Sequence, residues 1–174
     1  MKPLNIDRSV TDAFYRYQMP PIALKIEGRG NGIKTVLLNI KEVARSLGRD
    51  AKHLTKYLSL ELGALSSIDE ENSKYVINGA HDTEKVQKYI FKFIDELVLC
   101  KGCRNPETLL FCTSSRKLVH QKCIACGFEG AVKSSNKLIK GLLKELPGKE
   151  SIAEEKNEGF EEFEDFEGNG YAFG

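Results

Sequence analysis

The chain has 174 residues, of which 41% are hydrophobic, so it is long enough for one substantial core and a small satellite unit. No stretch is long and apolar enough to span a membrane. The net charge of +1 hides an asymmetry, because residues 151–174 carry eight acidic side chains and one lysine, which leaves the first 150 residues with +8. This distribution favours a phosphate-rich partner for the body and a basic partner for the tail, although a solvated lysine-rich surface would give the same balance.

Residues 1–21 mix polar and aromatic side chains without clear periodicity, and they predict an extended N-terminal arm. The arm ends at Met19-Pro20-Pro21, and because a residue before proline avoids the helical region, no helix should continue into the next segment. The first eight residues contain no apolar run of the kind that a signal peptide needs, so we expect a reducing, cytoplasmic environment.

Residues 22–98 predict an α+β domain that begins with a hairpin. Residues 23–27 alternate apolar and polar side chains like a half-buried strand, and residues 35–38 supply its neighbour. The connecting loop is Gly28-Arg29-Gly30-Asn31-Gly32-Ile33-Lys34-Thr35. A phosphate-binding loop needs a glycine directly before the lysine and a helix directly after it. Here Ile33 precedes Lys34 and a strand follows, so contact with a nucleic-acid backbone is favoured over nucleotide binding.

Two short helices are predicted next. Asn39 is a candidate N-cap with Glu42 three positions later, and apolar residues then recur at helical spacing until Gly48. A second helix is predicted from Asp50 to Leu62. Such a pair can form a helix-turn-helix that reads DNA, but short helical pairs are also common in protein cores, and we favour the core.

A second hairpin is predicted at residues 67–69 and 74–77, on either side of a polar turn. From Asp82 a longer helix is predicted, whose apolar stripe consists of Val86, Ile90, Phe93, Ile94 and Leu97. This helix leads almost directly into Cys100, so the segment that follows should be mounted rigidly on the domain.

Four cysteines in two close pairs predict a metal site, and they are Cys100, Cys103, Cys123 and Cys126. Each pair can direct two thiolates at one ion, and four thiolates complete a tetrahedral zinc shell within a ribbon over residues 99–133. Such a closed shell has no open coordination position, so the zinc is expected to stabilise structure and not to activate water. The alternative, two disulfides in a secreted protein, is disfavoured because the N-terminus does not resemble a signal peptide.

Cys112 lies in an apolar run between the two pairs and is expected to be a buried strand residue, not a ligand. His120 is close to the second pair, but four cysteines already fill the shell. Residues 134–147 predict a basic amphipathic helix. Residues 148–174 form an acidic tail with regularly spaced phenylalanines, which favours a disordered segment that binds a partner.

Several segments taken together resemble the N-terminal domain of the eukaryotic translation initiation factor 5 family. The segments that carry the resemblance are Arg8-Ser9-Val10, Phe14-Tyr15-Arg16-Tyr17-Gln18-Met19-Pro20, the glycine-rich loop, Glu61-Leu62-Gly63-Ala64, Val76-Ile77-Asn78-Gly79, Asn105-Pro106-Glu107-Thr108 and the cysteine pairs. The beta subunit of initiation factor 2 has a similar fold and ribbon, but its family is not expected to contain the aromatic arm or the glycine-rich loop. The resemblance therefore favours factor 5.

This resemblance implies a GTPase-activating role in which Arg16 is supplied in trans to the GTP site of the gamma subunit of initiation factor 2. A guanidinium suits this role because it is always charged and can neutralise charge that develops on the γ-phosphoryl oxygens. The resemblance also implies support from Lys34 and Lys56, which by residue type alone are ordinary surface lysines. The GTP belongs to the partner, so we expect the chain itself neither to bind GTP nor to be an enzyme.

The resemblance implies further partners. The domain is expected to dock on the small ribosomal subunit beside initiator tRNA and the mRNA start codon, with the loop from Arg29 to Lys34 as an RNA contact. The tail is similar to acidic and aromatic boxes that bind lysine-rich segments, which implies contact with the beta subunit of initiation factor 2. We expect a monomer with no membrane partner.

Taken together, the sequence predicts an α+β fold with a small mixed sheet packed with helices, followed by a four-cysteine zinc ribbon and a C-terminal helix. The predicted function is a translation initiation factor that couples start-codon recognition to GTP hydrolysis. Two alternatives stay open. One is a beta-type subunit of initiation factor 2, which would not need Arg16, and the other is a generic zinc-ribbon nucleic-acid binder, whose binding to DNA would depend steeply on salt.

Overall fold

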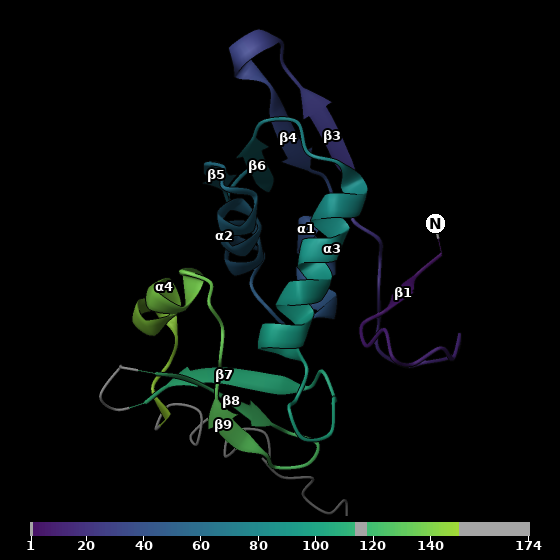
Figure 1. The fold of residues 1–174 in the computed structure, drawn as a ribbon, viewed down its shortest axis with the longest axis vertical. Helices are drawn as coiled ribbons and strands as arrows, with labels where there is room; N and C mark the ends of the chain where they lie inside the picture. Colours follow the sequence, from purple (N-terminus) through teal and green to yellow (C-terminus); the bar gives the residue numbers. More distant parts are fainter. Residues whose placement is uncertain (1, 114–117, 150–174) are drawn as a thin grey trace, which may run out of the picture.

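The computed structural model describes residues 2–113 and 118–149. Its parts are stacked along one axis, with a four-stranded sheet at one end, helices in the middle and a three-stranded ribbon at the other end (Figure 1). The tail predicted over residues 148–174 lies outside the described residues except for Gly148 and Lys149. Within the described ranges, no helix combines the length and apolar character that crossing a membrane requires.

The four-stranded sheet consists of β3 (Leu24–Glu27), β4 (Lys34–Leu37), β5 (Ser66–Asp69) and β6 (Lys74–Asn78), in the order β3-β4-β6-β5. Both predicted hairpins are confirmed, because β3 pairs with β4 and β5 pairs with β6. The two hairpins meet along β4 and β6, which are also antiparallel. Every pairing in this sheet is therefore antiparallel where a mixed sheet was predicted, since short turns reverse the chain within each hairpin and a parallel neighbour would need a longer crossover.

Three helices cover one face of this sheet, namely α1 (Ile40–Ser46), α2 (Ala51–Leu62) and α3 (Thr83–Phe93), and α3 continues without a break as the π-helix η2 (Ile94–Val98). Opposite residues of an antiparallel pair share a face of the sheet. On the covered face, Leu37 and Ile77 are buried and join the apolar stripes of the helices in one core. The stripe predicted for the longer helix is buried along its whole length, so these three predicted helices are confirmed, and α1 and α2 both pack in this core.

The N-terminal ends of α1 and α2 differ in how their backbone donors are satisfied. At α2, the Asp50 side chain accepts a hydrogen bond from the Lys52 N–H at 2.8 Å, as an N-cap does. At α1, the predicted cap is wrong, because Asn39 makes no such bond. Its amide instead donates to the Pro21 carbonyl at 2.9 Å and accepts from the Ala23 N–H at 2.8 Å. Asn39 therefore ties the end of the arm to the helical layer.

The N-terminal segment folds back on itself, although an extended arm was predicted. Its two ends form a short antiparallel pair between β1 (Leu4–Asn5) and β2 (Gln18–Met19). Ile6 and Met19 are buried in the main core, and this burial of apolar surface favours the closed loop over an extended chain. The result is an ordered loop on the side of α3 that faces away from α2 (Figure 1).

The ribbon consists of β7 (Thr108–Cys112), β8 (Val119–Cys123) and β9 (Glu129–Ala131), paired antiparallel in that order. The predicted C-terminal helix is confirmed as α4 (Leu138–Glu145), which packs on α2 and β8. Leu138 and Leu142 of α4 are buried in the main core. The chain after α4 returns to the edge of β7, where the Cys112 N–H donates to the Pro147 carbonyl at 3.0 Å.

Candidate metal centre and arginine-bearing arm

The four predicted metal ligands converge at one end of the ribbon. The Sγ atoms of Cys100, Cys103, Cys123 and Cys126 all lie within 4.8 Å of one another. Two of these sulfur pairs, Cys100 with Cys126 and Cys103 with Cys123, are 3.6 Å apart. A tetrahedral ion with metal–sulfur bonds of about 2.3 Å requires neighbouring sulfurs to be about 3.8 Å apart. The arrangement therefore fits one metal ion, and the three strands beside it are consistent with a zinc ribbon.

The backbone around these cysteines favours thiolates. The Gly102 N–H points at Cys100 Sγ at 3.3 Å, and the Cys126 N–H points at Cys123 Sγ at 3.4 Å. Burial raises the pKa of the Cys100 thiol, but the N–H groups of Cys103 and Gly102 outweigh this effect and bring that pKa to about 7. Since a thiol binds a metal in its deprotonated form, the site is prepared for a cation.

Cys112 and His120 lie outside the metal centre, as predicted. Cys112 is buried at the end of β7, where its Sγ donates to the Leu143 carbonyl at 3.5 Å. The His120 ring packs against the Phe111 ring, with centroids 5.5 Å apart. In the described part of the chain, the four cysteines form the only cluster of three or more residues that could hold a metal ion.

Arg16 lies on the exposed part of the N-terminal loop, shortly before β2. Its guanidinium is 5.7 Å from the centroid of the Tyr17 ring, a distance compatible with a cation–π contact. The Tyr15 and Tyr17 rings meet edge to face, with centroids 5.6 Å apart. Nearby, the Phe14 side chain is 95% exposed. The loop therefore presents a cationic and an aromatic side chain to solvent from an ordered backbone.

The glycine-rich loop forms the free tip of the β3–β4 hairpin (Figure 1), where η1 (Gly30–Gly32) makes a single turn. Gly28 has φ of 92°, and a Cβ atom there would lie 2.2 Å from the Gly32 carbonyl oxygen, so this position requires glycine. The loop borders a pocket of about 280 Å³ that also contains Asn78 and Gly79. The strand expected after this loop is confirmed, since β4 begins at Lys34.

Within this loop, the residues predicted to contact phosphate are placed differently. Arg29 and Lys34 are exposed. Thr35 is buried, and its hydroxyl donates to the Gly79 carbonyl at 2.7 Å and accepts from the His81 N–H at 3.1 Å. Thr35 therefore holds the loop against β6 and is not available to a phosphate.

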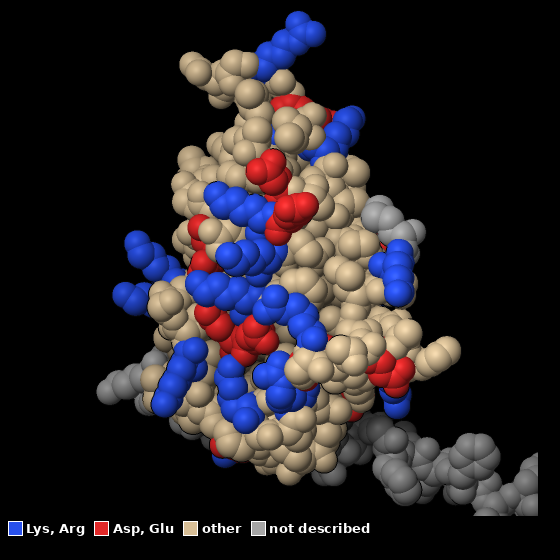
Figure 2. All heavy atoms as spheres, turned by 45° about the vertical axis from the view of Figure 1, so that its right-hand side comes forward, with Lys and Arg blue, Asp and Glu red and all other residues tan. Residues whose placement is uncertain are grey.

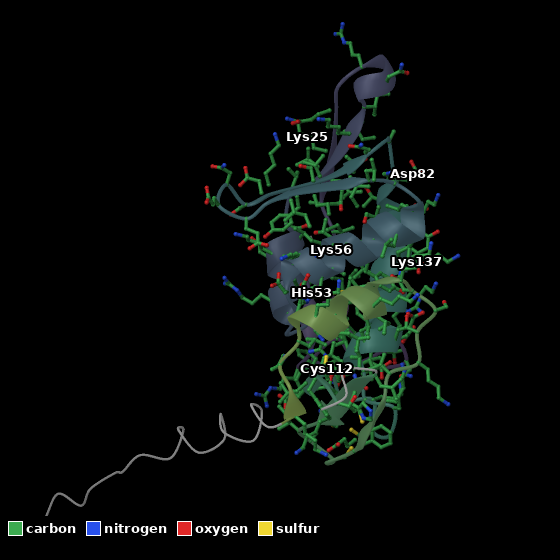
Figure 3. The ribbon with its side chains drawn as sticks, turned by 90° about the vertical axis from the view of Figure 1, so that its left-hand side faces the viewer. Lys25, His53, Lys56, Asp82, Cys112 and Lys137 are labelled. Carbon is green, nitrogen blue, oxygen red and sulfur yellow. The ribbon has the colours of Figure 1, made fainter. Side chains whose placement is uncertain are left out.

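Lys56 on α2 is half-exposed and is paired with α4. Its Nζ atom donates to Glu145 Oε1 at 3.0 Å, and His53 Nε2 lies 2.7 Å from Glu145 Oε2. Both residues lie at the junction of α2 and α4 (Figure 3). The hydrogen bonds from His53 and Lys56 lower the pKa of Glu145 to about 2. Sequence reasoning missed this pairing, because no local pattern connects residues on two helices that are far apart in the chain.

The structure does not bring the three candidate activating residues into one catalytic centre. Arg16 is on the loop beside α3, Lys34 begins β4 near the free tip of the sheet, and Lys56 faces α4. In Figure 1 the loop and α2 lie on opposite sides of α3. Each of these side chains would have to act on a separate part of a partner surface.

One face of the molecule carries many positive side chains. Figure 2 shows Lys and Arg side chains gathered over α3, with acidic side chains among them. On α3 itself, Lys85 and Lys88 are exposed, and Lys92 donates to Glu61 Oε2 at 2.8 Å. The predicted basic body therefore has a physical counterpart, although part of its charge is neutralised by local ion pairs.

Over residues 7–129, the chain matches a protein family that is described as a domain found in initiation factors 2B and 5. The chain belongs to this family. The matched range contains the arm from Asp7 onward, the whole α+β body and all four metal ligands. The predicted resemblance to this group of proteins is thus confirmed over most of the described residues.

Three relatives illustrate the similarity. The chain is 48% identical over 147 residues to eukaryotic translation initiation factor 5 of Drosophila melanogaster, which covers 84% of this chain and 32% of the fly protein. It is 44% identical over 144 residues to the Saccharomyces cerevisiae protein of that name, covering 83% and 35%. It is 50% identical over 136 residues to probable eukaryotic translation initiation factor 5-1 of Arabidopsis thaliana, covering 78% and 31%. The chain spans about a third of the length of these relatives.

Proposed function

We propose that this domain acts in translation initiation as a GTPase-activating protein for initiation factor 2 bound to GTP and initiator tRNA. Membership of the family of initiation factors 2B and 5, and similarity to proteins named eukaryotic translation initiation factor 5, support this proposal. The observation that carries it is the exposed Arg16 on an ordered loop between two tyrosines. The domain is not itself an enzyme, and its site of action is the cytoplasm.

In this proposal, Arg16 acts in trans at the GTP site of the gamma subunit of initiation factor 2. A guanidinium near the γ-phosphoryl group stabilises the charge that builds up on its oxygens during hydrolysis. Arginine residues supplied in this way accelerate hydrolysis roughly 10³- to 10⁵-fold in other GTPases. The cation–π distance to Tyr17 favours a preferred direction of the side chain, which lowers the entropy that Arg16 loses on entering the site.

Lys34 and Lys56 have supporting roles in this proposal. Lys34 is exposed at the start of β4 and can contact a phosphate or carboxylate directly. Lys56 must first leave Glu145 or share it, because that carboxylate accepts its hydrogen bond at 3.0 Å. The effect of replacing Lys56 should therefore be smaller than the effect of replacing Arg16.

The exposed charges support docking on the small ribosomal subunit near initiator tRNA and the start codon. The tip of the β3–β4 hairpin combines Arg29 and Lys34 with glycines that permit close approach to RNA phosphates. The positive side chains over α3 add to this surface (Figure 2). The acidic tail is a candidate for binding the beta subunit of initiation factor 2, by charge complementarity.

The metal in the four-cysteine centre is zinc in this proposal, because four thiolates in a tetrahedral arrangement suit that ion. All four protein ligands are occupied by one ion, so the zinc keeps no position for water or GTP. It stabilises the ribbon, and the GTP is held by the partner.

The test is single-turnover GTP hydrolysis by the complex of initiation factor 2, GTP and initiator tRNA on the small ribosomal subunit. Wild-type protein should accelerate hydrolysis, and Arg16→Ala should lose about 10²-fold or more of this stimulation while binding is kept. Arg45→Ala is the matched control, because Arg45 is an exposed arginine on α1. Equal stimulation by wild type and Arg16→Ala would contradict the role of Arg16.

The family description names initiation factor 2B beside initiation factor 5, and this supports a second candidate function as a beta-type subunit of initiation factor 2. A subunit would co-purify with its partners in equal amounts and would give no stimulation in the assay above. A generic nucleic-acid binder would also leave GTP turnover unchanged, but its binding to DNA would weaken steeply as salt increases.

A further inference from the structure

The N-terminal loop is attached to the turn that follows the first cysteine pair. Arg104 in this turn donates from Nε to Asp7 Oδ2 at 2.9 Å and from Nη2 to Asp7 Oδ1 at 2.8 Å. The Asp7 side chain is 3% exposed, whereas that of Arg104 is 52% exposed. A forked arginine–carboxylate pair fixes both distance and orientation. Because the carboxylate is buried, loss of Arg104 would leave it without its counter-charge.

A second attachment lies at the other end of the loop. The Tyr17 hydroxyl donates to Glu107 Oε1 at 2.9 Å, and Glu107 belongs to the same turn as Arg104. The loop is closed between these points by the Ile6 N–H, which donates to the Tyr17 carbonyl at 3.0 Å. Arg16 lies between the two attachments, next to Tyr17. One turn of the ribbon therefore holds both sides of the segment that carries Arg16.

The geometry of this turn depends on the cysteine pair. The Arg104 N–H donates to the Cys100 carbonyl at 3.0 Å, and the Cys100 N–H donates to the Asn105 carbonyl at 3.0 Å. Arg104 has φ of 58°, in the left-handed region that non-glycine residues rarely adopt. The direction of the Arg104 side chain is thus set by the same backbone that directs Cys100 and Cys103 to the metal.

Another contact holds the loop to the body. The Arg8 guanidinium lies 4.6 Å from the centroid of the Phe91 ring, and its Nη2 atom is 3.4 Å from Asp95 Oδ2. Asp95 is also 3.7 Å from Arg104 Nη2. These contacts are exposed, so solvent weakens them, and the buried Asp7 carboxylate makes the stronger attachment.

We infer that the ribbon positions the activating arm, with Arg104 and Glu107 as positioning residues for Arg16. The inference rests on the proposed role of Arg16, but the attachment itself can be tested without any GTPase. It assigns the metal-binding ribbon a task beyond its own stability, which is to keep the loop ordered before the partner is met. An ordered loop loses less entropy when Arg16 enters the partner's site.

The first measurement is amide hydrogen exchange in the metal-bound protein. Arg104→Asn removes the fork, and asparagine tolerates a left-handed backbone. Exchange of the Ser9 and Phe14 amides, which donate to Asp7 Oδ1 and Asp12 Oδ1, should become about tenfold faster or more. Lys149→Gln is the matched control, because Lys149 pairs with Glu129 on the ribbon at 2.6 Å, away from the loop. Unchanged exchange in Arg104→Asn with intact metal content would overturn the attachment.

The second measurement is the GTPase assay at increasing protein concentration. Arg104→Asn should lower the maximal rate about tenfold while the concentration for half-maximal stimulation changes less than about twofold, and Arg104→Lys should recover part of the rate through its charge. An equal maximal rate in wild type and Arg104→Asn would overturn the positioning role. If wild type gives no stimulation, the proposed function and the positioning role fall together, whereas faster loop exchange would still support the attachment.

Discussion

In the α+β body, buried aliphatic and aromatic side chains from three helices and one sheet face meet in a single cluster. In the ribbon, the buried side chains of the three strands are few, and they include Phe111, Val119 and two metal ligands. The body can therefore gain most of its stability from apolar burial. The ribbon is too small for this, and small units of this kind depend on a metal or on cross-links.

The two regions meet at a polar junction. Arg49, between α1 and α2, donates to the Leu97 carbonyl at 2.7 Å and to both the carbonyl and the hydroxyl of Thr108 at 2.7 Å. Gln121 of β8 donates to the Val98 carbonyl at 3.1 Å. Burial lowers the pKa of Arg49 to about 10, so the guanidinium is still charged at neutral pH. The comparison teaches that the metal-dependent region is joined to the apolar one through directional hydrogen bonds.

Metal removal should have the largest effect and should separate the two regions. Structural zinc sites contribute on the order of 10 kcal/mol to folding. Chelation or Cys123→Ser should abolish exchange protection in β7 to β9 and in the loop at residues 5–18, while β4 and β6 keep theirs. Cys112→Ala is the control, because Cys112 lies outside the sulfur cluster. Protected ribbon amides after complete metal removal would contradict the comparison.

Replacement of Arg49 should have an intermediate effect, at the junction. Arg49→Ala leaves the carbonyls of Leu97 and Thr108 without their donor, which should cost about 2–3 kcal/mol. We expect unfolding by urea to change from one transition to two, since the ribbon and body lose their main polar connection. Arg45→Ala, an exposed arginine on α1, should shift unfolding by less than about 0.5 kcal/mol. A single unshifted transition for Arg49→Ala would show that apolar contacts alone hold the junction.

The contact between α2 and α4 should have the smallest effect. The hydrogen bonds from His53 and Lys56 lower the pKa of Glu145 from 4.5 to about 2. This group therefore stabilises the fold above about pH 4.5, and its contribution is lost as pH falls through about 2. After allowance for solvent screening, we expect wild type to be about 0.5–1 kcal/mol more stable than Glu145→Gln near neutral pH.

Urea unfolding of wild type and Glu145→Gln at a series of pH values checks this expectation. The difference between the two proteins should be constant above about pH 5 and should shrink toward zero in stronger acid. Subtraction of one protein from the other removes the effect that acid has on the cysteine thiolates of both. A difference that grows as the pH falls would have the wrong sign for a carboxylate with a lowered pKa.

Much of the fold follows from local patterns. The apolar stripe of α3, the two hairpins and the spacing of the cysteine pairs each involve neighbours in sequence, so residue types alone indicate them. The capping box at Asn39 fits the same local rules but does not form, because Pro21 and Ala23 compete successfully for its amide. A local rule fails where a distant segment offers the same side chain more hydrogen bonds.

The candidate site divides in the same way. The metal ligands were predictable because each C-x-x-C turn directs two sulfurs at one point, and Arg16 was selected through its flanking aromatic residues and the resemblance to factor 5. The attachment of the loop was not predictable, because Asp7 and Arg104 are 97 positions apart. The sequence contains a local signal only for the bonds from Asp7 to Ser9, which form an Asx turn.

The sequence by itself determined which segments become helices and strands, where the metal binds and which family the domain resembles. It did so because hydrophobic periodicity and ligand spacing are properties of short stretches. Only the tertiary structure decided that the arm folds back onto the ribbon, that Arg49 joins the two regions and that Lys56 is paired with Glu145. Each of these contacts depends on the position of a distant partner, and a polar side chain binds whichever partner the packed core brings within reach.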